Sequence, residues 1–177
     1  MSSNNTLSLL VSPGFRSAAY LGNALWFTSA AVHFGLFPEF MMGKLSTRKA
    51  DVKTIETPNG DSHHHDLMRY LGAINVGYAV LAGIRLAPFV IRRFSSDAKT
   101  NVKAAVKWDH DAFDIVAFTV LGTANLSQAL LNWFWAKPSG RWIIGHLING
   151  KPDRITVLDT LFSVVDFAIV GARLAGF

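Results

Sequence analysis

Four long apolar segments separated by polar connections dominate the pattern of this 177-residue sequence. A helix of about 20 apolar residues crosses the ~30 Å hydrocarbon core of a bilayer, so each segment is long enough to span it with some tilt. We therefore predict an all-α fold, a four-transmembrane-helix antiparallel bundle that forms a single integral membrane domain over residues 1–177. The four helices are expected at about residues 15–40, 67–91, 110–136 and 155–177.

The polar positions within these segments recur at helical spacing and form narrow stripes. In the last segment, steps of seven residues place Asp159, Asp166 and Arg173 on nearly one face, with Ser163 beside them. Charged side chains are costly inside a membrane and are kept where they face a bundle interior or a partner. A soluble four-helix bundle would instead carry a charged outer face, and here the faces opposite the stripes are apolar.

The connections carry turn and interface signals. Ser12 and Pro13 are suited to the N-cap and first residue of the first helix. The hydrophilic connection 41–66 contains the turn signal Thr57-Pro58-Asn59-Gly60, which predicts a surface loop. The connection 138–153 mixes Trp142 and several aliphatic residues with basic ones, which predicts a short interfacial segment between helices 3 and 4.

Composition narrows the class of protein. The chain has no cysteine, which excludes disulfides, thiol nucleophiles and thiolate metal sites. Its net charge is +5, from 17 Lys and Arg against 12 Asp and Glu. The basic residues are distributed over every connection, a pattern typical of contact with lipid headgroups and not of nucleic-acid binding. The first apolar segment is too long for a secretory signal and lacks a cleavage pattern, so we expect it to remain in place as a membrane anchor. An intracellular membrane is favoured.

One ion pair is expected from depth along the helices. Arg85 lies about two turns before the end of the second segment, and Asp114 lies about one turn after the start of the third. These two helix ends fall on the same side of the membrane, so a structural ion pair between Arg85 and Asp114 would neutralise both charges. Asp166 and Asn125 lie near the middle of their segments and are expected to meet at mid-depth.

The remaining polar residues on the helix faces have two interpretations, which the sequence leaves open. They are either interhelical hydrogen-bonding groups or the lining of a ligand-binding cavity. The ligand-binding candidates are Asn23, Trp26, His33, Arg69, Asn125, Gln128, Asn132, Asp159 and Asp166.

Three of these residues are also catalytic candidates. Helix ends that share one side bring His33 and Asp159 to the same level, together with Glu39, His65, Arg69, Gln128 and Asn132. An imidazole beside a carboxylate is suited to acid-base chemistry, and Asp166 is a further titratable group at mid-depth. No nucleophile-elbow, phosphate-loop, dinucleotide or zinc-protease motif is present, so the sequence identifies no catalytic residue and no cofactor.

Three consecutive histidines, His63, His64 and His65, form the most conspicuous cluster of metal-ligand residue types in the sequence. Three neighbours in a row cannot all point at one ion without strain, and no His-x-x-x-His spacing accompanies them. We therefore predict a solvated loop tract and no metal site.

Two of the segments resemble a known family. The run from Met68 to Asn75 resembles the Arg-x-x-Gly start of the second helix in small membrane proteins of the DoxX-like type. The end of the first segment, from Ala31 to Pro38, is similar to the first helix of that group, which often closes near a proline. The resemblance implies a four-helix bundle, and it carries no catalytic residue across because the family is diverse.

The sequence thus favours a multi-pass membrane protein that acts as a non-catalytic binding or accessory component. Its expected partners are the lipid bilayer and either other membrane subunits of a larger assembly or further copies of the chain. The alternative is a small membrane enzyme or carrier acting on a lipophilic small molecule such as a quinone, a sterol or a lipid.

Overall fold

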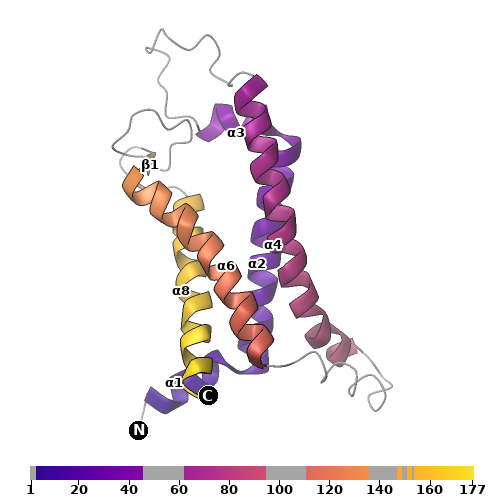
Figure 1. Cartoon of the computed structure of the whole chain (residues 1–177), viewed down its shortest axis with the longest axis vertical. Helices are drawn as coiled ribbons and strands as arrows, with labels where there is room; N and C mark the ends of the chain where they lie inside the picture. Colours follow the sequence, from indigo (N-terminus) through magenta and orange to yellow (C-terminus); the bar gives the residue numbers. More distant parts are fainter. Residues whose placement is uncertain (1–2, 46–61, 95–110, 136–146, 149–150, 153) are drawn as a thin grey trace. The chain divides into compact units, whose positions relative to one another are not determined.

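In the computed structural model, the part of the chain that is described is almost entirely helical (Figure 1). It describes residues 3–45, 62–94, 111–135, 147–148, 151–152 and 154–177. The short strands β1 and β2 form an antiparallel pair in which Leu147 faces Pro152 and Ile148 faces Lys151. The elements are α1 (Ser3–Leu10), α2 (Pro13–Leu36), α3 (Pro38–Leu45), α4 (Ser62–Phe94), α6 (Asp111–Leu130), the π-helical turn η1 (Leu131–Trp135), β1 (Leu147–Ile148), β2 (Lys151–Pro152) and α8 (Arg154–Leu174).

The first predicted helix is present but divided. α2 begins at Pro13, and Ser12 Oγ accepts a hydrogen bond from the Phe15 N–H at 3.3 Å, the geometry of an N-cap. α2 ends at Leu36 and α3 begins at Pro38, whereas a single helix was expected to continue to residue 40. Pro38 has no N–H and disfavours the helical conformation in the residue before it, so the break falls at this proline.

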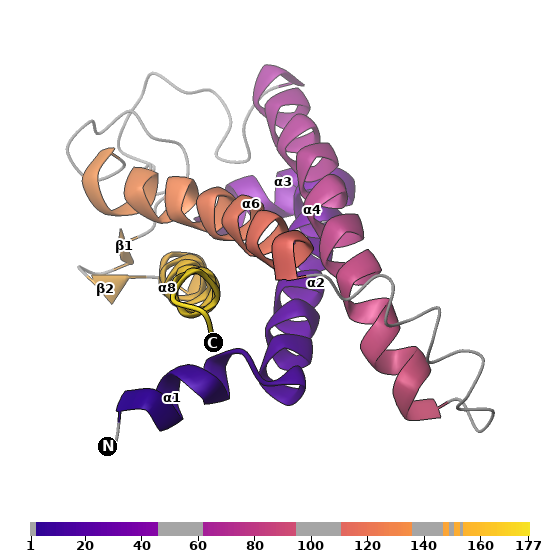
Figure 2. The same ribbon diagram turned by 60° about the horizontal axis from the view of Figure 1, so that its bottom comes forward.

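The N-terminal residues add a helix that the sequence pattern did not predict. α1 precedes α2, and the chain turns between them, as Figure 2 shows. The Ser12 N–H donates to the Leu9 carbonyl at 3.1 Å, which closes this turn.

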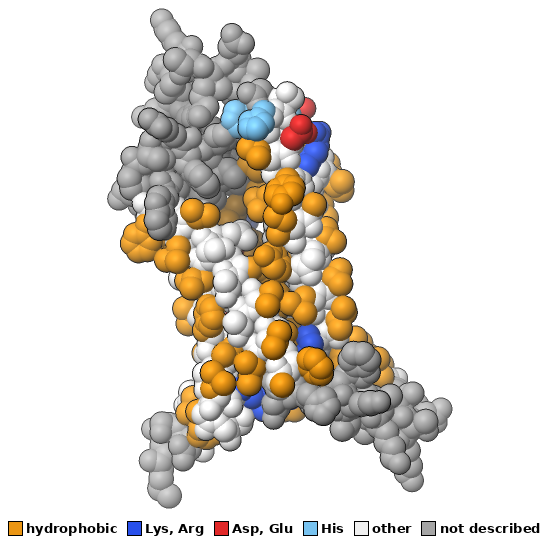
Figure 3. Space-filling view, in the orientation of Figure 1, with side chains coloured by type: hydrophobic (Ala, Val, Ile, Leu, Met, Phe, Trp, Pro, Cys, Tyr) orange, Lys and Arg blue, Asp and Glu red, His pale blue; other side chains and the backbone are white. Residues whose placement is uncertain are grey.

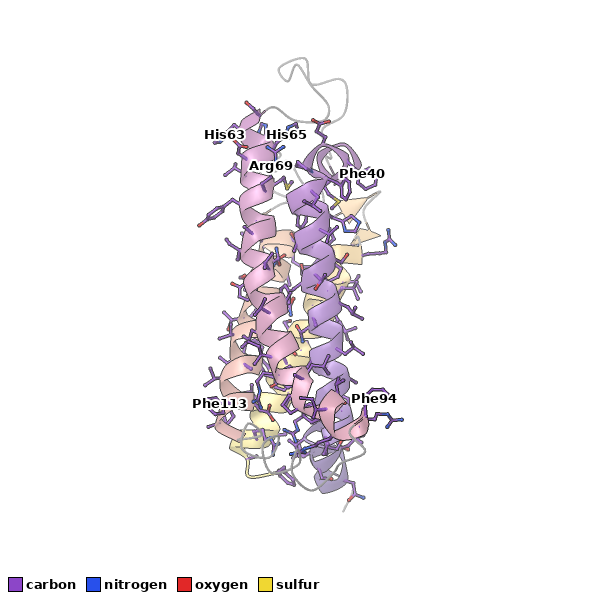
Figure 4. All side chains as sticks on the ribbon, turned by 90° about the vertical axis from the view of Figure 1, so that its right-hand side faces the viewer. Phe40, His63, His65, Arg69, Phe94 and Phe113 are labelled. Atoms are coloured by element: carbon purple, nitrogen blue, oxygen red, sulfur yellow. The ribbon has the colours of Figure 1, made fainter. Side chains whose placement is uncertain are left out.

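The second predicted helix begins earlier than expected. α4 starts at Ser62, so His63, His64 and His65 form its first turn, and the prediction of a loop for this tract was wrong. Successive helical residues are rotated by about 100°, so three neighbouring histidines point in different directions. The rings of His63 and His64 are inclined at 60°, with centroids 6.1 Å apart. Figure 4 shows His63, His65 and Arg69 at this end of α4 and Phe94 at the other.

The third and fourth predicted helices correspond to α6 with η1 and to α8. The connection between them contains the β1–β2 pair where we expected an interfacial segment. The remaining interfacial candidates, including Trp142, lie outside the described residues, as does the turn signal Thr57–Gly60.

Among the residues described, three helical segments are long and apolar enough to cross a membrane. They are Ser62–Phe94, Ala112–Phe134 and Arg154–Leu174. Large hydrophobic side chains lie on their outer surfaces, for example Val80 and Ile84 of α4 and Val164 of α8. The space-filling view shows hydrophobic side chains over much of the visible described surface (Figure 3). These features indicate an integral membrane protein.

The chain divides into two compact units, and the division falls within each of α2, α4, α6 and α8. Each unit therefore contains part of all four long helices. Unit 1 comprises Met1–Trp26, Tyr78–Ala124 and Phe162–Phe177, and unit 2 comprises Phe27–Gly77 and Asn125–Leu161.

Unit 2 contains a close approach of two helix backbones. A Cβ atom added to Gly72 of α4 would lie 2.6 Å from the nitrogen and 2.8 Å from the Cα of Gly35 in α2. Phe34, Met41 and Met68 form an apolar cluster in the same unit. The small residues thus permit α2 and α4 to pack at short range, as is common between membrane helices.

Candidate functional site

Asp114, the fourth residue of α6, is bonded to side chains from other helices of unit 1. It is fully buried. The Tyr20 hydroxyl donates to Asp114 Oδ1 at 2.7 Å, and Arg85 Nη2 donates to the same oxygen at 2.6 Å. Arg16 Nη1 donates to Oδ2, and Arg173 Nη2 lies 3.5 Å from Oδ2. We call these five residues the Asp114 cluster.

The Asp114 cluster joins four helices within unit 1. Arg16 and Tyr20 come from α2, Arg85 from α4, Asp114 from α6 and Arg173 from α8. Only 4% of Arg16 and 6% of Arg85 are exposed, and the Arg173 side chain is 10% exposed. Three guanidinium groups are therefore withdrawn from solvent around one carboxylate.

Aromatic rings enclose these charges. The Tyr20 ring stacks on Phe118 with centroids 4.1 Å apart. The Arg16 guanidinium lies 5.2 Å from the Phe89 ring centroid, and that of Arg85 lies 5.8 Å from the ring of Phe113, which Figure 4 labels. Such cation–π contacts stabilise an arginine that has lost part of its hydration.

Local sequence explains how α2 presents its part of the cluster. Arg16, Tyr20 and Asn23 are spaced i, i+4 and i+7, so they share one helix face, and all three are buried. Arg16 Nε also donates to the Val11 carbonyl in the turn before α2 at 3.0 Å, which fixes the guanidinium at the helix start.

The expected pair of Arg85 and Asp114 is therefore present as part of a larger cluster. Sequence reasoning did not include Arg16 or Tyr20 in it, and it placed Arg173 only on the stripe of α8. The signal that could have revealed these additional members is the distance of each residue from the end of its helix. Arg16 is the fourth residue of α2, Asp114 is the fourth residue of α6, and Arg173 is one residue before the end of α8.

The buried carboxylate Asp166 of α8 lies in the same unit. Asn23 Nδ2 donates to Asp166 Oδ1 at 2.9 Å and also to the Ala19 carbonyl at 3.1 Å. Asn23 is thus an amide partner of Asp166 that the sequence analysis did not suggest, and the contact expected between Asn125 and Asp166 stays a prediction. Gly122 of α6 permits a close approach of α8 at this residue, because a Cβ there would lie 3.1 Å from the Asp166 Cβ.

Two further candidates differ in their surroundings. Trp26 is half-buried in unit 1, and its ring packs near Phe162 with centroids 6.4 Å apart. Arg69 in unit 2 is exposed and forms an ion pair with Asp66 at 3.1 Å. Arg69 is thus engaged at the surface of α4.

Unit 2 contains the remaining candidates. Asn125, Asn132 and Asp159 are buried, Gln128 is half-buried, and two further buried polar residues, Asn75 and Thr156, accompany them. Trp133 Nε1 donates to Thr160 Oγ1 at 3.1 Å, which links η1 to α8.

His33 is on the outside of unit 2, whereas Asp159 is fully buried there. The described hydrogen bonds of His33 use Nδ1, which lies 2.7 Å from the Ser29 carbonyl and 3.3 Å from Ser29 Oγ. The imidazole is thus held against its own helix, and the proposed acid-base partners differ in their access to solvent.

The Asp114 cluster supplies fixed charge. Arginine stays protonated at every pH that proteins experience, so its guanidinium groups act as hydrogen-bond donors and not as proton carriers.

Within the described part of the chain, no group of three or more His, Asp or Glu side chains is arranged to hold a metal ion.

Comparison of the sequence and the structure with known proteins found no match. No protein-family model matches the sequence, and no curated protein or solved structure is significantly similar to it.

Proposed function

We propose that the chain is an integral membrane protein in which α2 spans the bilayer together with α4, α6 and α8, and that it acts as a non-catalytic binding or accessory component of a membrane assembly. The resemblance of the first two helices to DoxX-like proteins is consistent with this architecture.

The Asp114 cluster is the observation that carries the proposal. A buried carboxylate surrounded by guanidinium groups needs close and complete pairing, because removing one partner leaves a charge that is very costly in a medium of low polarity. Arg16 and Tyr20 of α2 bond to Asp114 of α6, so α2 is required for that pairing. This dependence supports a membrane position for α2 although its apolar length alone does not identify it as a span.

The surroundings of two catalytic candidates, His33 and Asp166, support a non-catalytic role. His33 is exposed and held to Ser29, while Asp166 is buried and bonded to Asn23. Small residues instead bring α2 and α4 into close contact at Gly35 and Gly72. Polar and small-residue contacts of this kind stabilise helix association in membranes.

Cysteine accessibility tests the architecture, because the natural chain has no cysteine. Single cysteines at Asn59 and Gly150 should react with a membrane-impermeant thiol reagent from one side of sealed vesicles. Cysteines at Ser2 and Lys99, and one added after Phe177, should react from the other side. Labelling of positions 59 and 99 from the same side would show that α4 does not span.

Native assembly tests the accessory role. Membranes solubilised in mild detergent should yield the chain in a particle of defined composition larger than a single copy, and Asp114→Asn should lower its recovery. The exposed substitution Asp66→Asn is the matched control and should leave recovery unchanged. A single-copy particle that converts a lipophilic substrate would contradict the accessory role.

A second candidate function is a small membrane enzyme or carrier for a quinone, a sterol or another lipid-like molecule. The buried polar residues of unit 2 favour it, since a lipophile with a polar group needs a few such contacts in an apolar surrounding. Saturable binding of a lipophile that is abolished in Asp159→Asn, with turnover or uptake lost in parallel, would support this candidate.

A further inference from the structure

The bend between α2 and α3 carries a group of exposed apolar side chains in unit 2. Leu36 is 72% exposed, Phe37 is 53% exposed and Phe40 is 56% exposed. The Phe40 side chain also has an interaction within the protein, so only its outer part belongs to this surface. Large apolar side chains gathered at one exposed place indicate a surface that contacts an apolar partner.

The bend is a fixed part of the fold. The Phe37 N–H donates to the His33 carbonyl at 3.1 Å, and the Met41 N–H donates to the Phe37 carbonyl at 3.1 Å. Met41 of α3 is buried in the apolar cluster with Phe34 of α2 and Met68 of α4. This packing holds one side of α3 against the two long helices, and Figures 1 and 4 show α3 running across the end of α2.

Helix length relates this bend to the membrane. α2 has 24 residues, a rise of about 36 Å along its axis, which exceeds the ~30 Å hydrocarbon core of a bilayer. In the proposed architecture α2 therefore crosses the bilayer without α3. A short helix that turns aside after a complete crossing lies at the boundary between acyl chains and headgroups, where its apolar side enters the bilayer and its polar side faces water.

The side chains around the bend suit such a position. The exposed carboxylate of Glu39 is next to the exposed apolar residues and is suited to the water side. The adjoining part of α4, next to Met68, exposes Leu67 and Tyr70, so the apolar surface of the bend continues onto a helix that is long and apolar enough to span.

We infer that α3 lies in the plane of the membrane surface and that Leu36, Phe37 and Phe40 anchor this end of unit 2 in the lipid bilayer. The inference rests on the proposed span of α2 and specifies the lipid contact at which that span ends. The partner of the exposed apolar surface is the boundary region of the acyl chains, and Glu39 faces the aqueous side.

Spin labelling of the full chain tests the inference, because the natural chain has no cysteine. Single cysteines replacing Phe37, Glu39 or Val80 would carry a nitroxide label in phosphatidylcholine vesicles. The measurement compares collisions of each label with oxygen, which concentrates in the bilayer, and with a nickel chelate, which stays in water. Val80 is exposed near the middle of α4 and serves as the reference for the apolar core.

The ratio of oxygen to nickel collisions should be several-fold higher at position 37 than at position 39, and lower at position 37 than at position 80. This order follows from a shallow apolar anchor beside a residue in water. If Phe37→Cys does not enter the vesicles, Leu36→Cys replaces it with the same expected ratio.

Equal ratios at positions 37 and 39 would overturn the inference, whether both labels behave as in water or both behave as at position 80. Few collisions with either reagent at position 37 would also overturn it, because protein would then cover the surface. A core-like ratio at position 80 in these cases would leave the proposed membrane architecture standing. A water-like ratio at position 80 would contradict that architecture and the inference together.

Discussion

The hydroxyl of Tyr20 lies 2.7 Å from Oδ1 of Asp114, although the two residues are 94 positions apart in the sequence. Both side chains are fully buried. Tyrosine can extend an apolar ring across an interior and present a donor at its far end, which is the role it has here. The contact ties the start of α2 to the start of α6 and leaves no exposed polar atom on either residue.

Replacing Tyr20 with phenylalanine tests this bond alone. Tyr20→Phe keeps the ring stacked on Phe118 and removes only the donor. We expect the free energy of unfolding in micelles to fall by about 0.6–1.7 kcal/mol, the range for an interhelical hydrogen bond in a membrane. Tyr70→Phe on the exposed face of α4 is the control and should change nothing measurable.

Asp114 should contribute far more to the free energy of unfolding than any single arginine of the cluster. Asp114→Asn would leave Arg16, Arg85 and Arg173 close together without their shared anion, and we expect a loss of about 3–5 kcal/mol in unfolding free energy. Asp66→Asn, which breaks an exposed pair with Arg69, should cost about 0–1 kcal/mol.

A double-mutant cycle of Arg85→Ala with Asp114→Asn tests how the cluster is coupled. An isolated pair would make Arg85→Ala worse alone than in combination with loss of the carboxylate. In the observed cluster, Arg85→Ala leaves Asp114 bonded to Arg16, so its cost should be smaller than that of Asp114→Asn. The losses should be less than additive by about 0.5–3 kcal/mol, and strict additivity would show that the residues act independently.

Gly72 is expected to tolerate no side chain. A methyl group there would overlap the backbone of Gly35, which cannot move away without shifting the whole helix. Gly72→Ala should therefore lower unfolding free energy by about 1–3 kcal/mol. Gly77→Ala in the same helix meets no atom within 4 Å and should be neutral or stabilising by up to about 1 kcal/mol. Equal effects at the two glycines would refute the close contact.

The long helices were predictable because their cause is local. Apolar runs long enough to span a bilayer are visible in the sequence, and the N-cap at Ser12 follows from residue types alone. The helix limits were less predictable. Pro38 divides the first segment, and the polar residues His63 to His65 extend α4 where composition favoured a loop.

The cluster around Asp114 was only partly predictable, because it depends on contacts between distant segments. Depth along the helices correctly suggested that Arg85 and Asp114 could meet. It does not reveal helix rotation, so it could not show that the face carrying Arg16 and Tyr20 turns toward Asp114. The bond from Asn23 to Asp166 was missed for the same reason, because depth alone did not show that the face of α2 carrying Asn23 turns toward α8.

The final prediction concerns the bond between Asn23 and Asp166. Asn23 Nδ2 needs an acceptor on α8, and an asparagine at position 166 supplies one through its carbonyl oxygen. Asp166→Asn should therefore lower the free energy of unfolding by less than about 1 kcal/mol. Asp166→Leu should lower it by about 1–3 kcal/mol, because it leaves a buried amide donor without this acceptor. Thermal unfolding of the two variants in the same detergent provides the comparison.

This substitution also separates a structural carboxylate from a working one. If Asp166 only joins α2 to α8, Asp166→Asn should assemble as the natural chain does. If its charge or proton takes part in binding or transport, Asp166→Asn should lose that activity while keeping its stability. The bond to Asn23 favours the structural role, and a stable Asp166→Asn protein without activity would contradict it.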